Sequence, residues 1–318
     1  MTKNILLKMY WTMVLIRRFE EKIASILRSP EKDIKTPCHL YIGQEAVAVG
    51  VCAALKKTDY IFGTHRSHGC YLAKGGNLRQ LAAEIYCRAN GCSGGNGGSM
   101  HLIAPEIGLL GTSAIVGASI PLAVGAALAC KIKRDHRVAV AFFGDGATNE
   151  GGFYESLNLA SLYKLSVIFV CENNLYSTHL PIEKCLANTN ISQIAKSFKM
   201  PAHRIDGNDA VKVYQTARVA VSRARRGQGP SFIECLTYRW LGHVGPNDDI
   251  DKGLRSQAEL DSWREKCPIN KLEKLLVGNK NFCSLHQQID QAIETAFKIA
   301  RQSPYPDIKE LTKKVFKE

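Results

Sequence analysis

The sequence lacks the cysteine patterns of a disulfide framework or a zinc site. Its eleven cysteines include no CxxC pair and no zinc-type spacing. Most of them lie within apolar runs, as Cys52, Cys130, Cys171 and Cys235 do. This pattern is typical of buried thiols in a reducing compartment, so we expect a cytoplasmic protein.

The sequence also lacks a segment that predicts a membrane span. Its longest apolar stretch, residues 114–130, contains Gly117, Pro121 and Gly125. These small residues favour a close-packed buried helix over a membrane span, which needs about 20 residues. The N-terminal segment mixes charged and apolar residues and no cleavage site follows, so we expect no signal peptide. Internal repeats and low-complexity tails are absent from the sequence.

Acidic residues are in deficit, with 29 Asp and Glu against 42 Lys and Arg, a net charge of +13. Such an excess invites a nucleic-acid hypothesis. The basic residues are spread along the chain without a recognised binding motif, so we predict no nucleic-acid partner. Two interpretations stay open: an ordinary solvated surface, or basic patches that meet an acidic partner subunit or an anionic substrate.

The most informative stretch is residues 138–176, which predicts a strand, a helix and a second strand. Residues 138–143 and 166–171 are continuous apolar runs rich in β-branched side chains, as expected of strands buried on both faces of a parallel sheet. Apolar residues at helical spacing lie between them. In such a crossover both strands end at the same edge of the sheet, where ligands bind in open α/β folds.

Polar residues gather where these two strands end. The first strand leads into Gly144-Asp145-Gly146 and the second into Glu172-Asn173-Asn174. Neighbouring strands lie roughly 4.8 Å apart, and Mg²⁺ takes oxygen ligands at about 2.0–2.1 Å, so Asp145 and Asn174 can reach one ion. Because Mg²⁺ held by few protein groups completes its shell with water and phosphate oxygens, the pattern predicts a diphosphate ligand. Gly144-Asp145-Gly146 alone is explained equally well by a tight turn after a strand. The pair Asn173-Asn174 at the end of the next strand favours a metal site instead.

This GDG and NN pairing resembles the signature of the thiamine-diphosphate-binding fold. The whole chain is similar to the alpha subunit of the decarboxylating component of 2-oxoacid dehydrogenase complexes, of the pyruvate and acetoin type. Five further segments carry the resemblance: HLYIGQEAVAVG (39–50), THRSHG (64–69), GGSMH (97–101), IVGASIP (115–121) and YRWLGH (238–243). It implies an α/β fold with a mostly parallel sheet and helices on both faces. We expect one diphosphate-binding domain over residues 1–318, with an N-terminal helix and a C-terminal helical segment.

The resemblance also assigns site residues. Those implied to bind thiamine diphosphate are His65, Arg66, Ala114, Val116, Asp145, Gly146, Ala147, Asn174, Tyr176, Arg239 and His243. Mg²⁺ would be held by Asp145, Asn174 and the backbone carbonyl of Tyr176. His68 and His243 are the candidate catalytic groups, because imidazole titrates near neutral pH. His39 fits a core or loop histidine as easily as a substrate contact.

Several positions depart from the family pattern. Asn96 stands in the glycine-rich loop where relatives usually carry a basic residue, which puts an anion contact there in doubt. His65 stands where many relatives have Tyr, and Ala114 where Gly is common. Val244 replaces the phosphorylatable Ser of regulated mitochondrial relatives. Residues 177–179 differ from the commonest pyruvate-type loop, so the sequence leaves the 2-oxoacid or hydroxyketone substrate open.

The implied function is a thiamine-diphosphate-dependent oxidoreductase. It would decarboxylate a pyruvate-like 2-oxoacid, or cleave acetoin, and transfer the acyl group to lipoamide on a lipoyl-bearing acyltransferase. The family's activating glutamate belongs to a second domain that this chain lacks, so we expect a heterotetramer with a beta subunit and the cofactor at the interface. Two alternatives stay open: a carboligase or ketol transferase acting on aldehyde or sugar acceptors, and a non-catalytic binding subunit.

Overall fold

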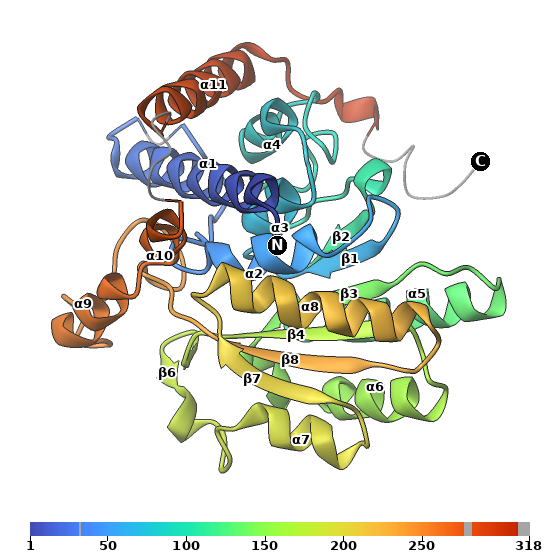
Figure 1. Cartoon of the computed structure of the whole chain (residues 1–318). Coiled ribbons are helices and arrows are strands. Elements are labelled where there is room, and N and C mark those ends of the chain that lie inside the picture. The colour runs from blue at the N-terminus through green and yellow to red at the C-terminus, as the bar shows by residue number, and fades with distance from the viewer. Residues whose placement is uncertain (32, 277–281, 311–318) are drawn as a thin grey trace.

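A six-stranded sheet forms the centre of the computed structural model, which describes residues 1–31, 33–276 and 282–310. The strand order is β2-β1-β3-β4-β8-β7, and every neighbouring pair is parallel (Figure 1). The strands are β1 (Tyr60–Gly63), β2 (Leu109–Thr112), β3 (Ala139–Gly144), β4 (Val167–Asn173), β7 (Ala202–Asp206) and β8 (Ser231–Leu236). The expected α/β fold with a parallel sheet is confirmed.

Helices cover both faces of this sheet. They are α1 (Lys3–Arg28), α2 (Glu45–Ala53), α3 (His68–Ala73), α4 (Leu78–Ile85), α5 (Ser119–Ile132), α6 (Gly151–Leu162), α7 (Ile191–Ser197), α8 (Ala210–Arg225), α9 (Gln257–Glu265), α10 (Pro268–Lys274) and α11 (Phe282–Gln302). Helices α2 and α8 lie on one face, with α1, α4 and α11 as a layer outside them, and α5, α6 and α7 cover the other face (Figure 1).

Strand β3 explains why the central apolar runs are unbroken. Val140 and Phe142 belong to the core on the α2 and α8 side, whereas Ala141 and Phe143 belong to the core on the α5 and α6 side. All four side chains are at most 1% exposed. Because successive side chains of a strand point to opposite faces, a strand between two helical layers needs apolar residues at every position.

The β3–α6–β4 crossover sets the position of the polar residues. Gly144 pairs in register with Glu172, and Asn173 pairs with Leu236 of β8. A short 3-10 helix, Asp145–Asn149, joins β3 to α6. The residues that follow β3, β4 and β8 therefore emerge side by side at one edge of the sheet.

Three local predictions differ from the structure. The sequence predicts a helix over residues 78–89, but α4 ends at Ile85, and Cys87 adopts a left-handed φ of 54°. Residues 114–130 are not one buried helix, because α5 starts only at Ser119 and its Leu122 is 53% exposed. The polar residues of 175–190 predict a loop without strands, but this segment contains a small antiparallel hairpin of β5 (Tyr176–Ser177) and β6 (Leu180–Pro181).

Within the part of the chain that the structure describes, no helix combines the length and hydropathy needed to cross a bilayer.

Candidate active site

A cleft of about 610 Å³, open to solvent, lies at the carboxyl-terminal edge of the sheet. Residues that follow β1, β3, β4 and β8 contribute to its walls, together with the turn before α5. Nearly all the residues predicted to bind the cofactor line this cleft, namely His65, Arg66, Val116, Asp145, Gly146, Ala147, Asn174, Tyr176, Arg239 and His243. Segments far apart in the sequence therefore converge on one cleft.

Ala114 and His68 do not line this cleft. The wall beside Ala114 is formed by its neighbours Ser113 and Ile115. His68 is completely buried at the start of α3. Its Nδ1 lies 2.9 Å from Oε1 of Glu20, and its Nε2 lies 2.9 Å from Oγ of Ser99. Both ring nitrogens have partners in the core, so the structure does not bring His68 to the place where a substrate would react.

Asp145 and Asn174, the predicted metal ligands, are neighbours. The backbone N–H of Asn174 donates to Oδ1 of Asp145 across 3.3 Å, and both residues are buried. Burial raises the pKa of Asp145 from 3.8 to about 6, because the carboxylate has few partners that replace its hydration. Oδ1 of Asn174 accepts from Nε of Arg239 at 3.3 Å. One carboxylate and one amide oxygen at this edge suit a hard cation such as Mg²⁺.

Two buried arginines make the cleft attractive to an anion. Arg66 donates to the carbonyls of Leu40 (2.7 Å) and His243 (3.0 Å), and Nη2 of Arg239 donates to the carbonyl of Thr178 (2.6 Å). Burial lowers the pKa of Arg66 to about 10 and that of Arg239 to about 9. Repulsion from Arg255 also lowers both values, and repulsion from Arg66 lowers that of Arg239. Nη1 of Arg239 is buried without a hydrogen-bond partner among the described residues. Planar guanidinium groups in this state suit phosphate oxygens.

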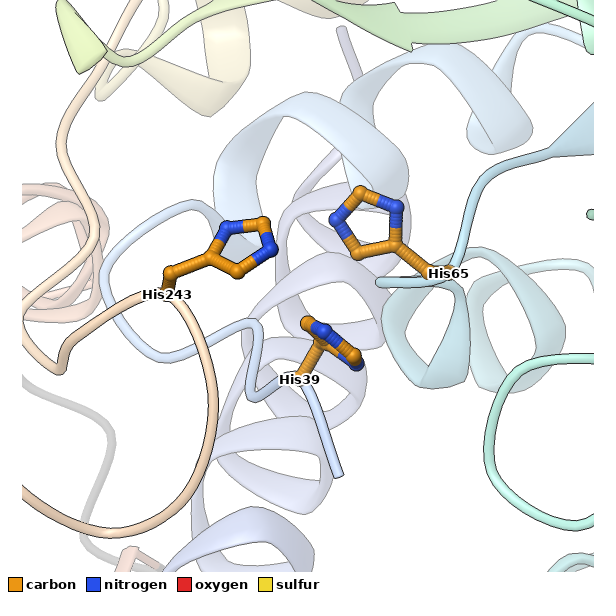
Figure 2. Close-up of side chains that lie close together, drawn as sticks. All are labelled: His39, His65 and His243. Carbon is orange, nitrogen blue, oxygen red and sulfur yellow. The ribbon is translucent and has the colours of Figure 1, made fainter. Parts of the chain in front are cut away.

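Three histidines lie close together (Figure 2), and two of them, His65 and His243, line the cleft. The ring centroids of His39 and His65 lie 4.5 Å apart, those of His39 and His243 4.9 Å, and those of His65 and His243 5.3 Å. Burial, and then the charge of Arg66, lowers their pKa values to about 4, about 2 and about 3 for His39, His65 and His243. All three imidazoles are therefore neutral at pH 7. His39, ambiguous in the sequence, lies directly against two of the predicted site residues.

The β5–β6 hairpin forms one rim of the cleft. Ser177 and Thr178 line it, and Thr178 has a left-handed φ of 57°. The hydroxyl of Tyr176 donates to Glu259 of α9 at 2.7 Å. Nδ1 of His179 lies 3.7 Å from a carboxylate oxygen of Asp249. Tertiary contacts, rather than the two short strands, hold this rim in place.

Two polar residues of the cleft, Gln44 and Glu172, were missed from the sequence. Glu172 is buried and accepts a hydrogen bond from the hydroxyl of Tyr41, and burial raises its pKa to about 7. Strand alternation contained the signal, because Glu172 near the end of β4 stands two positions before Asn174, which follows the strand. The sequence around Gln44 contains no such signal, because Gln44 lies 130 residues from Asn174 and only the tertiary fold brings the two together. There Nδ2 of Asn174 donates to Oε1 of Gln44 at 3.0 Å.

The glycine-rich loop 91–98 binds an internal carboxylate. Glu84 accepts hydrogen bonds from the backbone N–H groups of Ser93 (2.7 Å), Gly95 (3.0 Å), Gly97 (2.8 Å) and Gly98 (3.1 Å). Asn96 is exposed and turns its amide to carbonyls of its own loop. These backbone donors are therefore already used by Glu84 and are not free to bind an anion.

Comparisons with known proteins agree with this geometry. Residues 11–309 match the family described as Dehydrogenase E1 component. The alpha subunit of acetoin:2,6-dichlorophenolindophenol oxidoreductase from Bacillus subtilis is 41% identical over 320 residues, which cover 99% of this chain and 95% of that protein. The pyruvate dehydrogenase E1 component subunit alpha of Rhizobium meliloti is 39% identical over 311 residues, covering 96% and 88%. The chloroplastic subunit alpha-3 of Arabidopsis thaliana is 39% identical over 326 residues, covering 99% and 75%.

The chain therefore belongs to the dehydrogenase E1 component family. It is an oxidoreductase of the thiamine-diphosphate-dependent 2-oxoacid dehydrogenase type. The names of these relatives favour this function over the carboligase or ketol transferase that the sequence had left open.

Proposed function

We propose that this chain is the alpha subunit of a dehydrogenase that decarboxylates a pyruvate-like 2-oxoacid, or cleaves acetoin, and passes the acyl group to lipoamide. The observation that carries the proposal is the placement of Asp145 and Asn174 in one cleft with the buried Arg66 and with Arg239, whose Nη1 has no partner among the described residues. The relatives named as alpha subunits of pyruvate and acetoin enzymes support it.

The donors of the cleft fit thiamine diphosphate with Mg²⁺. Nη1 of Arg239, buried without a partner among the described residues, suits a phosphate oxygen, and Arg66 lies in the same wall. Asp145, Asn174 and the backbone carbonyl of Tyr176 would hold Mg²⁺, which in turn binds the diphosphate. The cation would also stabilise the buried Asp145 carboxylate, whose raised pKa shows that the N–H of Asn174 and the charge of Arg239 offset its burial only in part. The half-exposed Val116 offers an apolar contact for the cofactor's rings.

When bound, the cofactor supplies an electron sink that allows carbon dioxide to leave a 2-oxoacid. The chain's own residues bind, orient and exchange protons. Arg66 and Arg239 neutralise the diphosphate and fix its position. His243 is neutral and faces the cleft, so its ring can accept a proton from a reacting group or donate its N–H to a developing oxyanion. Burial of these groups keeps water out and strengthens their electrostatic effect.

We further infer that the chain is one diphosphate-binding domain and that a beta subunit completes the site. Among the acidic residues of the cleft, Glu172 is already hydrogen-bonded to Tyr41, which leaves the activating glutamate to come from a partner. Apolar side chains stand exposed beside the cleft, with Ile115 74%, Val116 50% and Leu122 53% exposed. An apolar surface at the mouth of a catalytic cleft suits a subunit interface. A lipoyl-bearing acyltransferase would then take the acyl group.

The free cysteines support the cytoplasm as the compartment. All eleven thiols are unpaired, and burial raises the pKa of Cys52 to about 12, so such thiols are unreactive. Thiols of this kind survive without pairing where the environment is reducing.

The test is reconstitution. The full chain is purified alone and with the beta subunit, and 2-oxoacid-dependent or acetoin-dependent reduction of 2,6-dichlorophenolindophenol is measured with thiamine diphosphate and Mg²⁺. We expect turnover only from the mixture and its loss in Asp145→Ala. Full turnover by the lone chain, or an unchanged Asp145→Ala mixture, contradicts the proposal.

A further inference from the structure

We propose that a second cleft, at the amino-terminal edge of the sheet, binds an organic polyphosphate of the nucleotide class. This amino-edge cleft is open to solvent, has a volume of about 990 Å³ and lies where α6, α7 and α8 end and β4, β7 and β8 begin. The seven residues of β4 rise about 3.3 Å each, so about 20 Å separates it from the cleft at the carboxyl-terminal edge. The two clefts share no lining residue among those the structure describes, so the site is independent of the proposed function.

Basic side chains, and no acidic ones among the described residues, line the amino-edge cleft. They are Lys164, Lys199 and Arg223. In the part of the chain that the structure describes, no carboxylate forms an ion pair with any of them. The carboxyl-terminal ends of α6, α7 and α8 carry about −0.5 charge each, which offsets about half of these positive charges. The rest is uncompensated, so the cleft attracts anions and repels metal ions.

Helix ends hold these cations around the cleft. Lys164 and Lys199 each follow the C-cap of a helix and have a left-handed φ, 49° after α6 and 58° after α7. The loop between α8 and β8 packs against Lys164, since a Cβ at Gly229 would lie 3.6 Å from the Cα of Lys164. Nη2 of Arg223 donates to the carbonyl of Gln228 in the same loop, which fixes the guanidinium.

Two polar atoms of the lining residues lack hydrogen-bond partners. Nε of Arg223 and Oγ of Ser161 are buried and have none among the described residues. Buried polar groups normally have a partner, so this wall is short of hydrogen-bond acceptors. A phosphate group carries several acceptor oxygens and binds well to a planar guanidinium. The missing acceptors and the excess of positive charge therefore point independently to phosphate.

The apolar part of the wall makes an organic phosphate a better ligand than an inorganic ion. Phe198 is partly exposed, Leu162 is 70% exposed, and both line the cleft. A flat heterocycle can stack on Phe198 while its phosphates contact the cations. The side-chain amides of Asn158 and Gln228 can hydrogen-bond to the polar edge of such a ring. Small-molecule sites typically have volumes of about 300–1,000 Å³, so the amino-edge cleft has room for a nucleoside di- or triphosphate.

The first experiment titrates ATP into the full chain by calorimetry without Mg²⁺, with pyrophosphate and adenosine as partial probes. We expect one ATP per chain, weaker binding of either partial probe, and an affinity for ATP that falls with added salt. Each of Lys164→Gln, Lys199→Gln and Arg223→Gln should weaken ATP binding about 10-fold, the effect of losing one hydrogen bond to a charged group. Two controls should bind ATP as the wild type does: Lys212→Gln at an exposed position in the first turn of α8, and Arg239→Met in the cleft at the carboxyl-terminal edge.

Phe198→Leu separates the two parts of the ligand. It should weaken ATP binding about 10-fold, because stacking of a base on an aromatic side chain contributes at least that much. The affinity for pyrophosphate, which has no ring, should stay unchanged. Equal affinities of the wild type for ATP and pyrophosphate would overturn the nucleotide class.

A third measurement avoids substitutions. Acetylation of lysines in the wild-type chain, mapped by mass spectrometry, should be slowed by ATP at Lys164 and Lys199 but not at Lys212. Absence of a one-to-one complex, or no protection of Lys164 and Lys199 by ATP, would each overturn the site. ATP binding that is lost in Arg239→Met and unchanged in Lys199→Gln would overturn it too, because the ligand would then lie in the other cleft.

Discussion

The backbone N–H of Asn174 donates to Oδ1 of Asp145 across 3.3 Å and so joins the end of β4 to the residue that follows β3. Their closeness follows from the parallel register in which Gly144 pairs with Glu172. This N–H leaves most of the carboxylate's hydrogen-bonding capacity unused in a buried place. The raised pKa of Asp145 is the result, and a cation is the natural compensation.

Asp145→Asn should remove a pH dependence from the stability of the cofactor-free chain. Burial raises the pKa of folded Asp145 from 3.8 to about 6, so between these values the folded state binds more protons than the unfolded state. Protonated Asp145 contributes about 3 kcal/mol to the unfolding free energy. This contribution is fully present below about pH 4 and is lost as the pH rises through about 6. Urea unfolding of both proteins at several pH values measures the difference.

The difference in unfolding free energy between the wild type and Asp145→Asn isolates the effect of Asp145 from that of the buried histidines. The lowered pKa values of the histidines make the chain less stable as the pH falls, whereas Asp145 makes it less stable as the pH rises. His39, His65 and His243 contribute stability above their unfolded pKa of 6.5 and lose it as pH falls toward their folded values. Asp251→Asn, at an exposed position, is the control. A wild-type minus Asp145→Asn difference that stays constant from pH 4 to 7 would show that the carboxyl does not titrate in this way.

Arg239→Met should weaken cofactor binding far more than it changes stability. Its guanidinium is buried near Arg66 and Arg255, which together with burial lowers its pKa to about 9. Removing the guanidinium relieves this repulsion, which offsets the lost hydrogen bonds to Thr178 and Asn174, so we expect the unfolding free energy to change by only about 1 kcal/mol. Loss of a buried charged partner should raise the dissociation constant of thiamine diphosphate about 30-fold or more.

Calorimetry with Mg²⁺ and the beta subunit present measures this affinity, and urea unfolding of the chain measures stability. Arg226→Met, at an exposed position after α8, should change neither quantity. Equal losses of stability and affinity in Arg239→Met would mean that Arg239 only holds the fold together.

The central crossover was predictable because its physical constraints act locally. Strands β3 and β4 are buried on both faces, so every residue from 139 to 143 is apolar, and the polar residues begin where each strand ends at the cleft. The β5–β6 hairpin was not predictable in the same way. Each strand has only two residues, and the turn is held by Arg239, which lies 61 residues from Thr178 in the sequence.

The histidines show where sequence reasoning about the site ends. His68 belongs to a motif that suggests chemistry, but Glu20 of α1, 48 residues away, holds its ring in the core. His39 carried little signal of its own and yet lies against His65 and His243. Which way a histidine points depends on partners from distant segments, and the spacing of residues along the chain does not contain that information.

Glu84→Gln should destabilise the chain through the glycine-rich loop. The carboxylate accepts four backbone hydrogen bonds, two at each oxygen. In the amide, the NH₂ group faces two N–H donors that then lose their acceptor, and the remaining bonds lose their charge. We expect a loss of about 2–4 kcal/mol in unfolding free energy, since hydrogen bonds to charged groups contribute about 1.5–3 kcal/mol each. Glu106→Gln at an exposed position is the control, and equal midpoints in urea would refute the assignment.

Gly146→Ala should weaken cofactor binding by moving the β5–β6 hairpin. A Cβ at position 146 would clash with Oγ of Ser177 and lie 3.0 Å from its Cβ, closer than side chains normally pack. The clash pushes Ser177 away from the cleft that both residues line, and we expect about a 10-fold loss of affinity for thiamine diphosphate, or about 1.4 kcal/mol.

Ser177→Gly removes both atoms of that clash, so the double variant should recover most of the affinity that Gly146→Ala loses. Coupling between touching residues is typically about 0.5–3 kcal/mol, and calorimetric titration of the two single variants and the double variant measures it. Gly151→Ala is the control, because a Cβ there meets no atom within 4 Å. If the double variant binds no better than Gly146→Ala alone, the hairpin is not the element through which position 146 acts, because removing its only clashing side chain changed nothing.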